Sequence, residues 1–348
     1  MPTTDQVTAQ LDRVVAADTG PFPIISLYLD LRPNERGRDQ FDQFLRKEFA
    51  DRVATYPASG PERESLDKDA DKIRDYVSRL EGSTNGLALF ACSGADLFEA
   101  IPMAAPVEAH RLYIDSHPQL YPLARILDEY PRYLALLVDT HSARIFVFAA
   151  NAVVKSEAIE GQKTKHHKKG GWAQARFQRH TENFHTQHAK EVVDAVERIV
   201  REEAIDKILV SGDEVILPLL RDQMPKQVAD KIVDIVKLDV RTPQHEVLQA
   251  TLETLREHDA ATDRERVDQL IGAYRANGLA TVGAENVRKA FELGQVDELV
   301  ITAMPEGTDE NNELVMQARN TAAKTRFIED ASLLAPVGGV GAFLRFKL

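Results

Sequence analysis

Short apolar runs alternate with longer stretches that are apolar on one side only. In the first 128 residues, apolar runs bounded by Pro or polar residues predict strands at 22–31, 86–92 and 97–103. Stretches with a single apolar stripe predict surface helices at 4–17, 38–54 and 62–81. We therefore expect a mixed α/β domain at 1–128, which ends near Tyr130-Pro131.

The middle of the chain opens with three strand-like runs between residues 133 and 159, which predict a meander or a pair of hairpins. A helix is then predicted from about 173 to 204, because one buried stripe recurs at three- and four-residue steps: Phe177, Phe184, His188, Val192, Val196, Ile199 and Val200. A strand at 206–212, a helix at 215–224 and a strand at 231–239 follow. This alternation predicts a layered α/β domain at 129–242.

A polar helical stretch at 243–276 leads into the last part of the chain. Strands are predicted there at 279–283, 297–303 and 341–348, and helices at 284–294 and 311–325. We therefore expect a small α/β domain at 243–348. The fold class predicted for the whole chain is α/β, with three domains.

Composition narrows the class of protein. The chain has 348 residues, of which 43% are hydrophobic and 28% charged, as in soluble globular proteins. No apolar run approaches the roughly 20 residues that span a bilayer, and the N-terminus lacks the pattern of a secretory signal. The single cysteine, Cys92, lies in an apolar run and is predicted to be buried. We expect a cytoplasmic, monomeric protein with no membrane contact.

One basic stretch contrasts with the acidic whole. The net charge of −12 argues against general coating of nucleic acid, because phosphate would be repelled over most of the surface. Residues 161–181 nevertheless contain six Lys or Arg and three His, and no acid. Any contact with nucleic acid is therefore predicted to be local to this stretch.

Two adjacent glycines, Gly170 and Gly171, lie inside the basic stretch. A glycine pair permits positive φ and close approach of the backbone to a ligand, and its N–H groups could donate to an oxyanion or a water. The side chains that could hold phosphates around it are Lys163, Lys165, His166, His167, Lys168, Lys169, Arg176 and Arg179. The alternative is a solvated hairpin tip followed by a basic helix start. Since basic residues at a helix N-terminus oppose the macrodipole, the charge favours a functional loop.

Trp172 and the histidines leave alternatives open. Trp172 could stack on a base or anchor the loop to its own helix, and the sequence does not separate these roles. A metal site could draw on His166, His167, His180, His185 and His188. No Cys lies nearby and no second two-ligand motif matches, so we expect no metal. His188 falls on the apolar stripe, which favours a core histidine.

The sequence contains no complete nucleotide-binding motif and no complete motif for a catalytic nucleophile. The stretch at 338–343, GGVGAF, resembles a glycine-rich phosphate turn, but only a strand is predicted after it, so no helix dipole is available. VSGDE at 210–214 has no P-loop lysine, and no G-x-S-x-G elbow occurs. We therefore expect no cofactor.

The pattern Gly170, Gly171, Arg176, Phe177 resembles the signature of the archaeal and eukaryotic class-1 peptide chain release factors. In that family GGQ is followed by a short spacer, Arg-Phe and a long helix. VDTHSARIFVF, VGAENVRKAFELGQVDELVIT and GGVGAFLRF resemble further segments of the same family, in order, over about 132–348. Related groups are Pelota-type rescue factors, bacterial release-factor-like proteins, Vms-type peptidyl-tRNA hydrolases and the hibernation factor Balon.

The resemblance implies a middle domain that carries its loop into the peptidyl-transferase centre of the ribosome. It implies contacts with ribosomal RNA and tRNA, and a third domain, similar to RNA-binding ribosomal proteins, that docks a translational GTPase. Two departures matter. Trp172 replaces the family glutamine, with Gln174 two positions later, and residues 1–128 lack the motifs that read stop codons.

Two mechanisms are compatible with these residues. In the first, the loop hydrolyses the ester of peptidyl-tRNA in ribosome rescue, with Gly170, Gly171, Trp172 and Gln174 as catalytic residues. A preorganised N–H would stabilise the oxyanion, and Gln174 would orient water. In the second, the protein occupies the ribosome without chemistry, as a stress or hibernation factor, with Trp172 stacked on a base. A scaffold unrelated to translation, with an incidental basic loop, is a third possibility.

Overall fold

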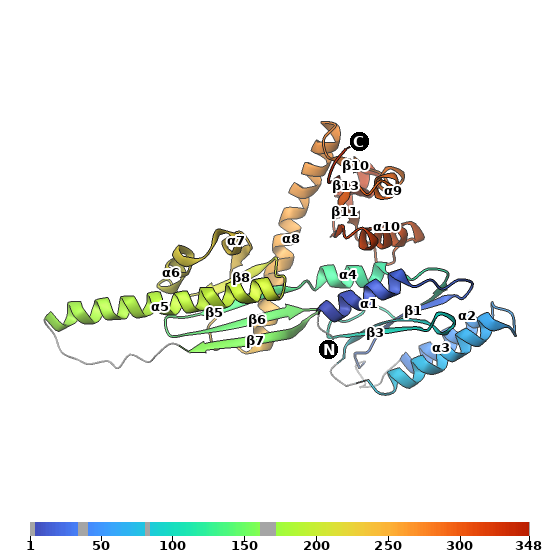
Figure 1. Ribbon diagram of the computed structural model, residues 1–348, viewed down its shortest axis with the longest axis horizontal. Coiled ribbons are helices and arrows are strands. Elements are labelled where there is room, and N and C mark those ends of the chain that lie inside the picture. Colours follow the sequence, from blue (N-terminus) through green and yellow to red (C-terminus); the bar gives the residue numbers. More distant parts are fainter. Residues whose placement is uncertain (1–3, 34–40, 81–83, 161–171, 348) are drawn as a thin grey trace. The chain divides into compact units, whose positions relative to one another are not determined.

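The computed structural model describes residues 4–33, 41–80, 84–160 and 172–347, which form three β-sheets with covering helices (Figure 1). The chain groups into two compact units, residues 1–129 with 260–348, and residues 130–259. The α/β class predicted from the sequence is confirmed. The division into three domains at 128/129 and 242/243 stays a prediction.

The N-terminal sheet of the first unit is antiparallel, in the order β3–β2–β1–β4. Its strands are β1 (Ile24–Asp30), β2 (Gly86–Cys92), β3 (Leu97–Met103) and β4 (Arg111–Asp115), and its helices are α1 (Thr4–Ala16), α2 (Phe41–Val53), α3 (Pro61–Val77) and α4 (Tyr121–Glu129). The apolar sides of α2 and α3 pack on this sheet, with Phe49 and Leu66 in one cluster with Leu27. Cys92 is fully buried, as predicted.

The C-terminal sheet of the same unit has the order β10–β13–β11–β12, with β11 and β12 parallel. Its strands are β10 (Ala280–Val282), β11 (Val296–Thr302), β12 (Lys324–Ile328) and β13 (Val340–Leu344), and its helices are α9 (Ala284–Glu292), α10 (Asp309–Asn320) and α11 (Ala331–Leu334). The second half of α8 (Gln244–Arg275) packs Val267 and Leu270 against it. A Cβ at Gly341 would lie 2.6 Å from Cδ2 of Leu270, so glycine permits this close approach.

The helix predicted at 311–325 is wrong at its C-terminal end. Helix α10 ends at Asn320, Ala322 has a φ of 51°, and β12 begins at Lys324. Alanine and lysine favour a helix locally, but pairing with β11 buries Phe327 and Ile328 in the core. Tertiary packing therefore overrides local propensity in this segment.

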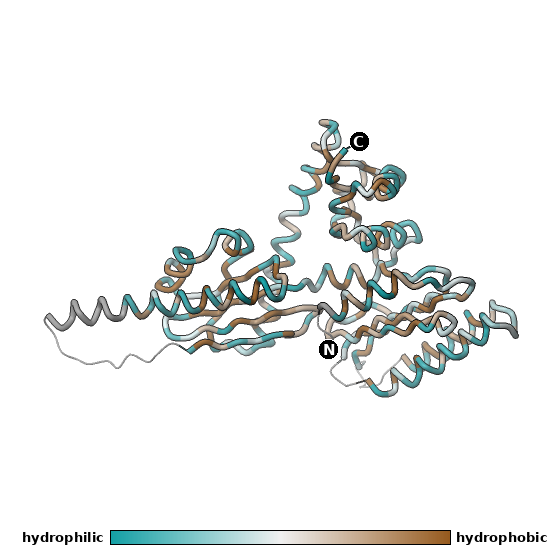
Figure 2. The backbone as a smooth tube through the Cα atoms, viewed as in Figure 1, coloured by the Kyte–Doolittle hydropathy of each residue, from teal (hydrophilic) through white to brown (hydrophobic). Residues whose placement is uncertain are grey.

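The central sheet of the second unit has the order β7–β6–β5–β8–β9. Its strands are β5 (Tyr133–Val138), β6 (Ser142–Ala149), β7 (Ala152–Glu160), β8 (Ile208–Gly212) and β9 (Ile232–Ile235), and its helices besides α8 are α5 (Trp172–Glu202), α6 (Ile216–Gln223) and α7 (Lys226–Ala229). The predicted antiparallel meander, β5–β6–β7, is confirmed, and β5, β8 and β9 run parallel. Helices α5, α6 and α7 share one apolar cluster with the sheet, and the first half of α8 shares another. Figure 2 shows the result, with strongly apolar strands inside and polar residues on the helices.

Candidate functional site

Helix α5, which follows the basic loop, packs the C-terminal half of its described side chains on the sheet. Its 31 residues correspond to about 46 Å of helix. The predicted stripe is confirmed from His188 onward, where Val192, Val196 and Ile199 are buried. Figure 1 shows the N-terminal part of α5 running past the end of the sheet. The fold therefore holds one end of α5 and lets the other end extend from the domain.

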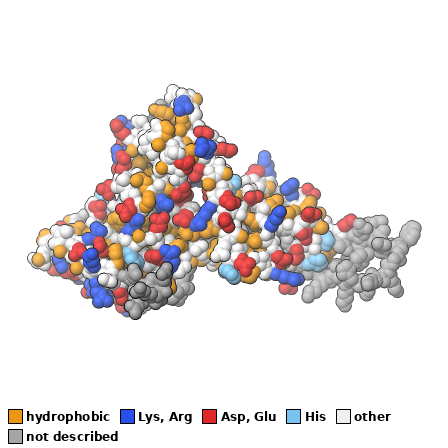
Figure 3. Space-filling view, turned by 180° about the vertical axis from the view of Figure 1, so that it is seen from behind, with side chains coloured by type: hydrophobic (Ala, Val, Ile, Leu, Met, Phe, Trp, Pro, Cys, Tyr) orange, Lys and Arg blue, Asp and Glu red, His pale blue; other side chains and the backbone are white. Residues whose placement is uncertain are grey.

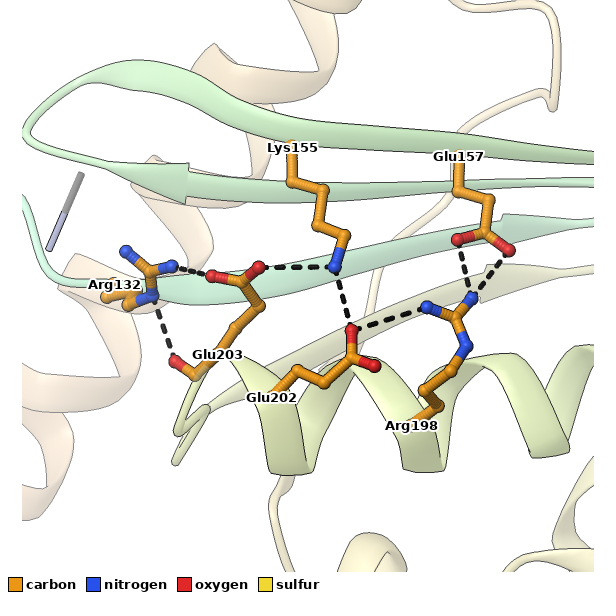
Figure 4. A network of polar contacts seen from close by, with 6 residues as sticks. All are labelled: Arg132, Lys155, Glu157, Arg198, Glu202 and Glu203. Carbon is orange, nitrogen blue, oxygen red and sulfur yellow. Dashed lines mark hydrogen bonds and ion pairs between the residues drawn. The ribbon is translucent and has the colours of Figure 1, made fainter. Parts of the chain in front are cut away.

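A polar network fastens the held end of α5 to the sheet (Figure 4). Arg198 donates to both carboxylate oxygens of Glu157 on β7, at 2.8 and 2.7 Å. Lys155, also on β7, donates to Glu202 at 3.0 Å and to Glu203 at 3.2 Å. Glu203 also pairs with Arg132, which precedes β5. Strand β7 and the residue that precedes β5 thus contact the C-terminal end of α5.

The ion pairs of this network shift the pKa values of Lys155 and Glu202 in the directions that favour their charged forms. The hydrogen bond from Lys155 lowers the pKa of Glu202, and the hydrogen bond to Glu202 raises the pKa of Lys155. Both groups remain charged near neutral pH. The network therefore acts as a charged clamp that fixes the direction in which α5 leaves the sheet.

A histidine cluster lies beside the carboxyl edge of the parallel strands. The rings of His141, in the turn after β5, and His185, on α5, have centroids 6.2 Å apart. His188 is one helical turn further along and is 1% exposed. Burial lowers the pKa of His185, and His141 and His188 lower it further, while Asp213 in the loop after β8 opposes them.

The predicted burial of His188 is confirmed, yet neither ring nitrogen has a hydrogen-bond partner among the described residues. Within the described ranges, no three His, Cys, Asp or Glu side chains are grouped so that they could hold a metal ion. Sequence analysis did not single out His141, because it comes from a turn more than forty residues before His185. The signal that could have found it is its place directly after a buried strand, β5, at the edge where parallel strands end.

The predicted loop residues divide into two sets. Those that lie outside the described residues are Lys163, Lys165, His166, His167, Lys168, Lys169, Gly170 and Gly171. Trp172, Gln174, Arg176 and Arg179 lie in the first turns of α5, where the structure describes the backbone alone. Positions 172 and 174 are therefore about 200° apart around the helix axis.

The described surface elsewhere mixes the two signs of charge. Figure 3 shows Lys and Arg interspersed with Asp and Glu across the face that it draws. Among the described residues, no helix combines the length and the apolar content required to cross a bilayer.

Comparisons with known proteins agree with this organisation. Residues 118–256 match the model of "Bacterial archaeo-eukaryotic release factor family 10". An uncharacterized protein of Mycobacterium tuberculosis (strain H37Rv) is 24% identical, over 96% of this chain and 96% of its own. Peptide chain release factor subunit 1 of Archaeoglobus fulgidus is 22% identical, over 72% of this chain and 74% of its own.

Two solved structures also align with the chain. The archaeal translation termination factor aRF1 aligns over 99% of both chains, at 16% identity and a TM-score of 0.29. Dom34 of S. cerevisiae, a translation termination-like factor, aligns over 76% of this chain and 80% of its own, at 14% identity and a TM-score of 0.45. The match of residues 118–256 to this family model agrees with the resemblance to release factors noted in the sequence, and this segment is similar to bacterial archaeo-eukaryotic release factor proteins.

Proposed function

We propose that the protein is a ribosome-associated rescue factor that presents residues 163–180 to the peptidyl-tRNA. The observation that carries this proposal is the position of the basic Gly-Gly stretch inside the matched segment, 118–256, directly before α5. A helix that is clamped at its C-terminal end suits a loop that must reach a distant target. A relative that is named a peptide chain release factor adds support.

Each part of the loop has a distinct role in this proposal. The cations between Lys163 and Arg179 hold phosphates of ribosomal RNA and tRNA, which compensates locally for the acidic charge of the chain. The backbone of Gly170, Gly171 and Trp172 donates to the oxyanion that forms when water attacks the ester. Gln174 orients that water. The C-terminal domain docks a translational GTPase.

A second candidate is a non-catalytic factor that occupies the ribosome during stress or hibernation. The specific observation that favours it is the helical backbone at both Trp172 and Gln174, which separates the two positions by about 200°. With glutamine displaced around the helix, Trp172 is available to stack on a base. Stacking contributes about 1–3 kcal/mol per base.

Binding is tested first, by co-sedimentation with ribosomes over a series of salt concentrations. Neutralising Lys165, Lys168, Lys169 and Arg179 together should weaken binding and lower the salt slope by roughly three. The matched control neutralises four exposed cations elsewhere in the same unit, Lys190, Arg201, Lys226 and Lys237, which changes the net charge equally. Equal binding by the loop variant and the control variant would contradict the proposal.

Catalysis is tested next, by release of labelled peptide from tRNA on the same ribosomes. For a hydrolase, Gln174→Ala should reduce the rate about tenfold or more, which corresponds to about 1.4 kcal/mol of barrier. Gly171→Ala should impair release as well, while binding persists because neither change removes a charge. Binding without release, together with weaker binding of Trp172→Ala, would establish the second candidate.

A further inference from the structure

An apolar pocket of about 320 Å³ lies in the second unit, on the side of the central sheet that α5, α6 and α7 cover (Figure 1). Its most buried lining residues are Val210 of β8, Leu220 of α6 and Met224. Met224 is extended, as expected before Pro225, so α6 ends there and α7 starts anew. The two short helices therefore cover β8 and β9 incompletely, and the pocket lies between them and β9.

The pocket is less buried on its outer side. Leu217, Ala229 and Ile232 line it and are half-buried, and Ile235 at the end of β9 is 44% exposed. Apolar surface of the walls is thus left in contact with water, and an apolar ligand would remove it from water. The chemistry of the walls therefore favours a ligand with an apolar body.

The volume indicates a small molecule rather than a partner helix. It falls at the lower end of the range of small-molecule sites, about 300–1,000 Å³. A helix with its side chains is about 10–12 Å across, so it needs a longer groove than this pocket of eight lining residues. None of those residues is aromatic, and the Met224 side chain adapts to irregular shapes. A flexible aliphatic chain fits such walls.

One charged side chain, that of Arg221 on α6, is among the lining residues, and no acid is. Arg221 is exposed and has no ion-pair or hydrogen-bond partner among the described residues, whereas Arg198 of the same unit pairs with Glu157. A guanidinium is suited to a carboxylate, which it can bind through two parallel hydrogen bonds. We propose that this pocket binds an aliphatic carboxylate, such as a medium-chain fatty acid, whose chain fills the pocket while its carboxylate pairs with Arg221.

The test is isothermal titration of the isolated full chain with octanoate, without ribosomes, so its result does not depend on the proposed function. We expect one saturable site. 1-Octanol has the same chain without the charge and should bind about fivefold more weakly, because it forms no ion pair with Arg221. Octylammonium should bind more weakly still, because its charge is repelled by that side chain.

Two variants separate the roles of the charge and of the apolar walls. Arg221→Gln should weaken the binding of octanoate about fivefold and leave that of 1-octanol unchanged. Ala229→Leu places a larger side chain in the pocket and should weaken the binding of both ligands about tenfold or more. The matched control is Arg201→Gln, which removes the same charge from an exposed position of α5 in the same unit and should bind both ligands as the unmodified chain does.

Thermal melts without ligand establish that each variant is folded, and octanoate should raise the melting temperature of the control variant but not that of Ala229→Leu. Equal loss of affinity in the two arginine variants, or unchanged binding of octanoate by Ala229→Leu, would overturn the proposal. Tighter binding of an acidic amphipathic helical peptide than of octanoate would also overturn it, since the pocket would then belong to a protein interface.

Discussion

The two long helices, α5 and α8, have almost the same length, 31 and 32 residues, but are buried in different ways. Helix α5 buries one face over a single stretch, from His188 to Val200, and belongs to a single unit. Helix α8 is buried at both ends. Val247 and Leu255 pack in the second unit, whereas Val267 and Leu270 pack in the first, and residues 256–261 between them are exposed or half-buried.

The difference shows that the distribution of buried positions, more than helix length, determines what a helix can do. A helix anchored at one end can present its other end to a partner, as we propose for α5. A helix anchored at both ends contributes to two cores, as α8 does. The ion pairs of the two helices differ in the same way. The ion pair of Arg198 with Glu157 lies at the anchored end of α5, and Asp263 of α8 pairs with Arg326 inside the first unit.

The largest expected effect comes from truncating either anchor of α8. Leu255→Ala and Leu270→Ala should each lower the free energy of unfolding by about 2–5 kcal/mol, because each leaves a cavity in a buried cluster. Hydrogen exchange should locate the two effects in different units, with Leu255→Ala affecting 130–259 and Leu270→Ala affecting 260–348. If either variant loosened both units equally, α8 would couple them and the comparison would fail.

The long helices were the part of the fold most accessible to sequence. The predicted ranges of 173–204 and 243–276 agree closely with α5 and α8, because long periodic stretches carry strong signals. Helix α4 and strand β4 were not predicted, since both are short and their stabilising contacts come from distant residues. Asn312, for example, bonds to the backbone just before α4 from almost two hundred positions away.

The candidate site was only partly predictable from the sequence. The basic loop was evident from its charge and its two glycines, which need no tertiary information. The histidine pair of His141 and His185 depends on chain segments that meet only after folding. No local pattern in the sequence distinguishes His141 from other histidines in turns.

A second prediction concerns the buried ion pair of α8. Asp263→Ala should lower the free energy of unfolding by about 1–3 kcal/mol, because Arg326, which is half-buried, loses its carboxylate partner at 2.9 Å and keeps the hydrogen bond to Thr262. Asp268→Ala, at an exposed position on the same helix, serves as the control and should change stability by less than about 0.5 kcal/mol. Chemical denaturation measures both. Similar effects of the two changes would mean that the pair contributes no specific stability.

A smaller effect is expected at the clamp of α5. Glu203→Gln weakens the contacts with Arg132 and Lys155 and should cost about 0.5–1.5 kcal/mol in free energy of unfolding. Because the interaction is electrostatic, the cost should shrink in about 0.5 M salt. Glu197→Gln, exposed on the same helix, is the matched control. A cost independent of salt would indicate that packing, and not charge, holds this end of α5.

The smallest expected effect is a pH dependence of the anchored part of α5. Burial and the neighbouring His141 and His188 hold the pKa of His185 below its ordinary value, with Asp213 in opposition. Above about pH 6.5 the imidazole is neutral in both the folded and the unfolded chain, so it does not affect stability. As the pH falls below that value, the unfolded chain takes up a proton that the folded chain resists. Stability is therefore lost until the pH passes through the lower folded pKa.

Because His185 is partly exposed, this loss should amount to a few tenths of a kcal/mol between about pH 7.5 and pH 5. Urea unfolding of the chain and of His185→Gln measures it, and the variant should show a flatter pH profile. Ring proton shifts of His185 should titrate with a midpoint below the ordinary histidine value. A midpoint above the ordinary histidine value would show that Asp213 outweighs burial, and the stability profile would then slope in the opposite direction.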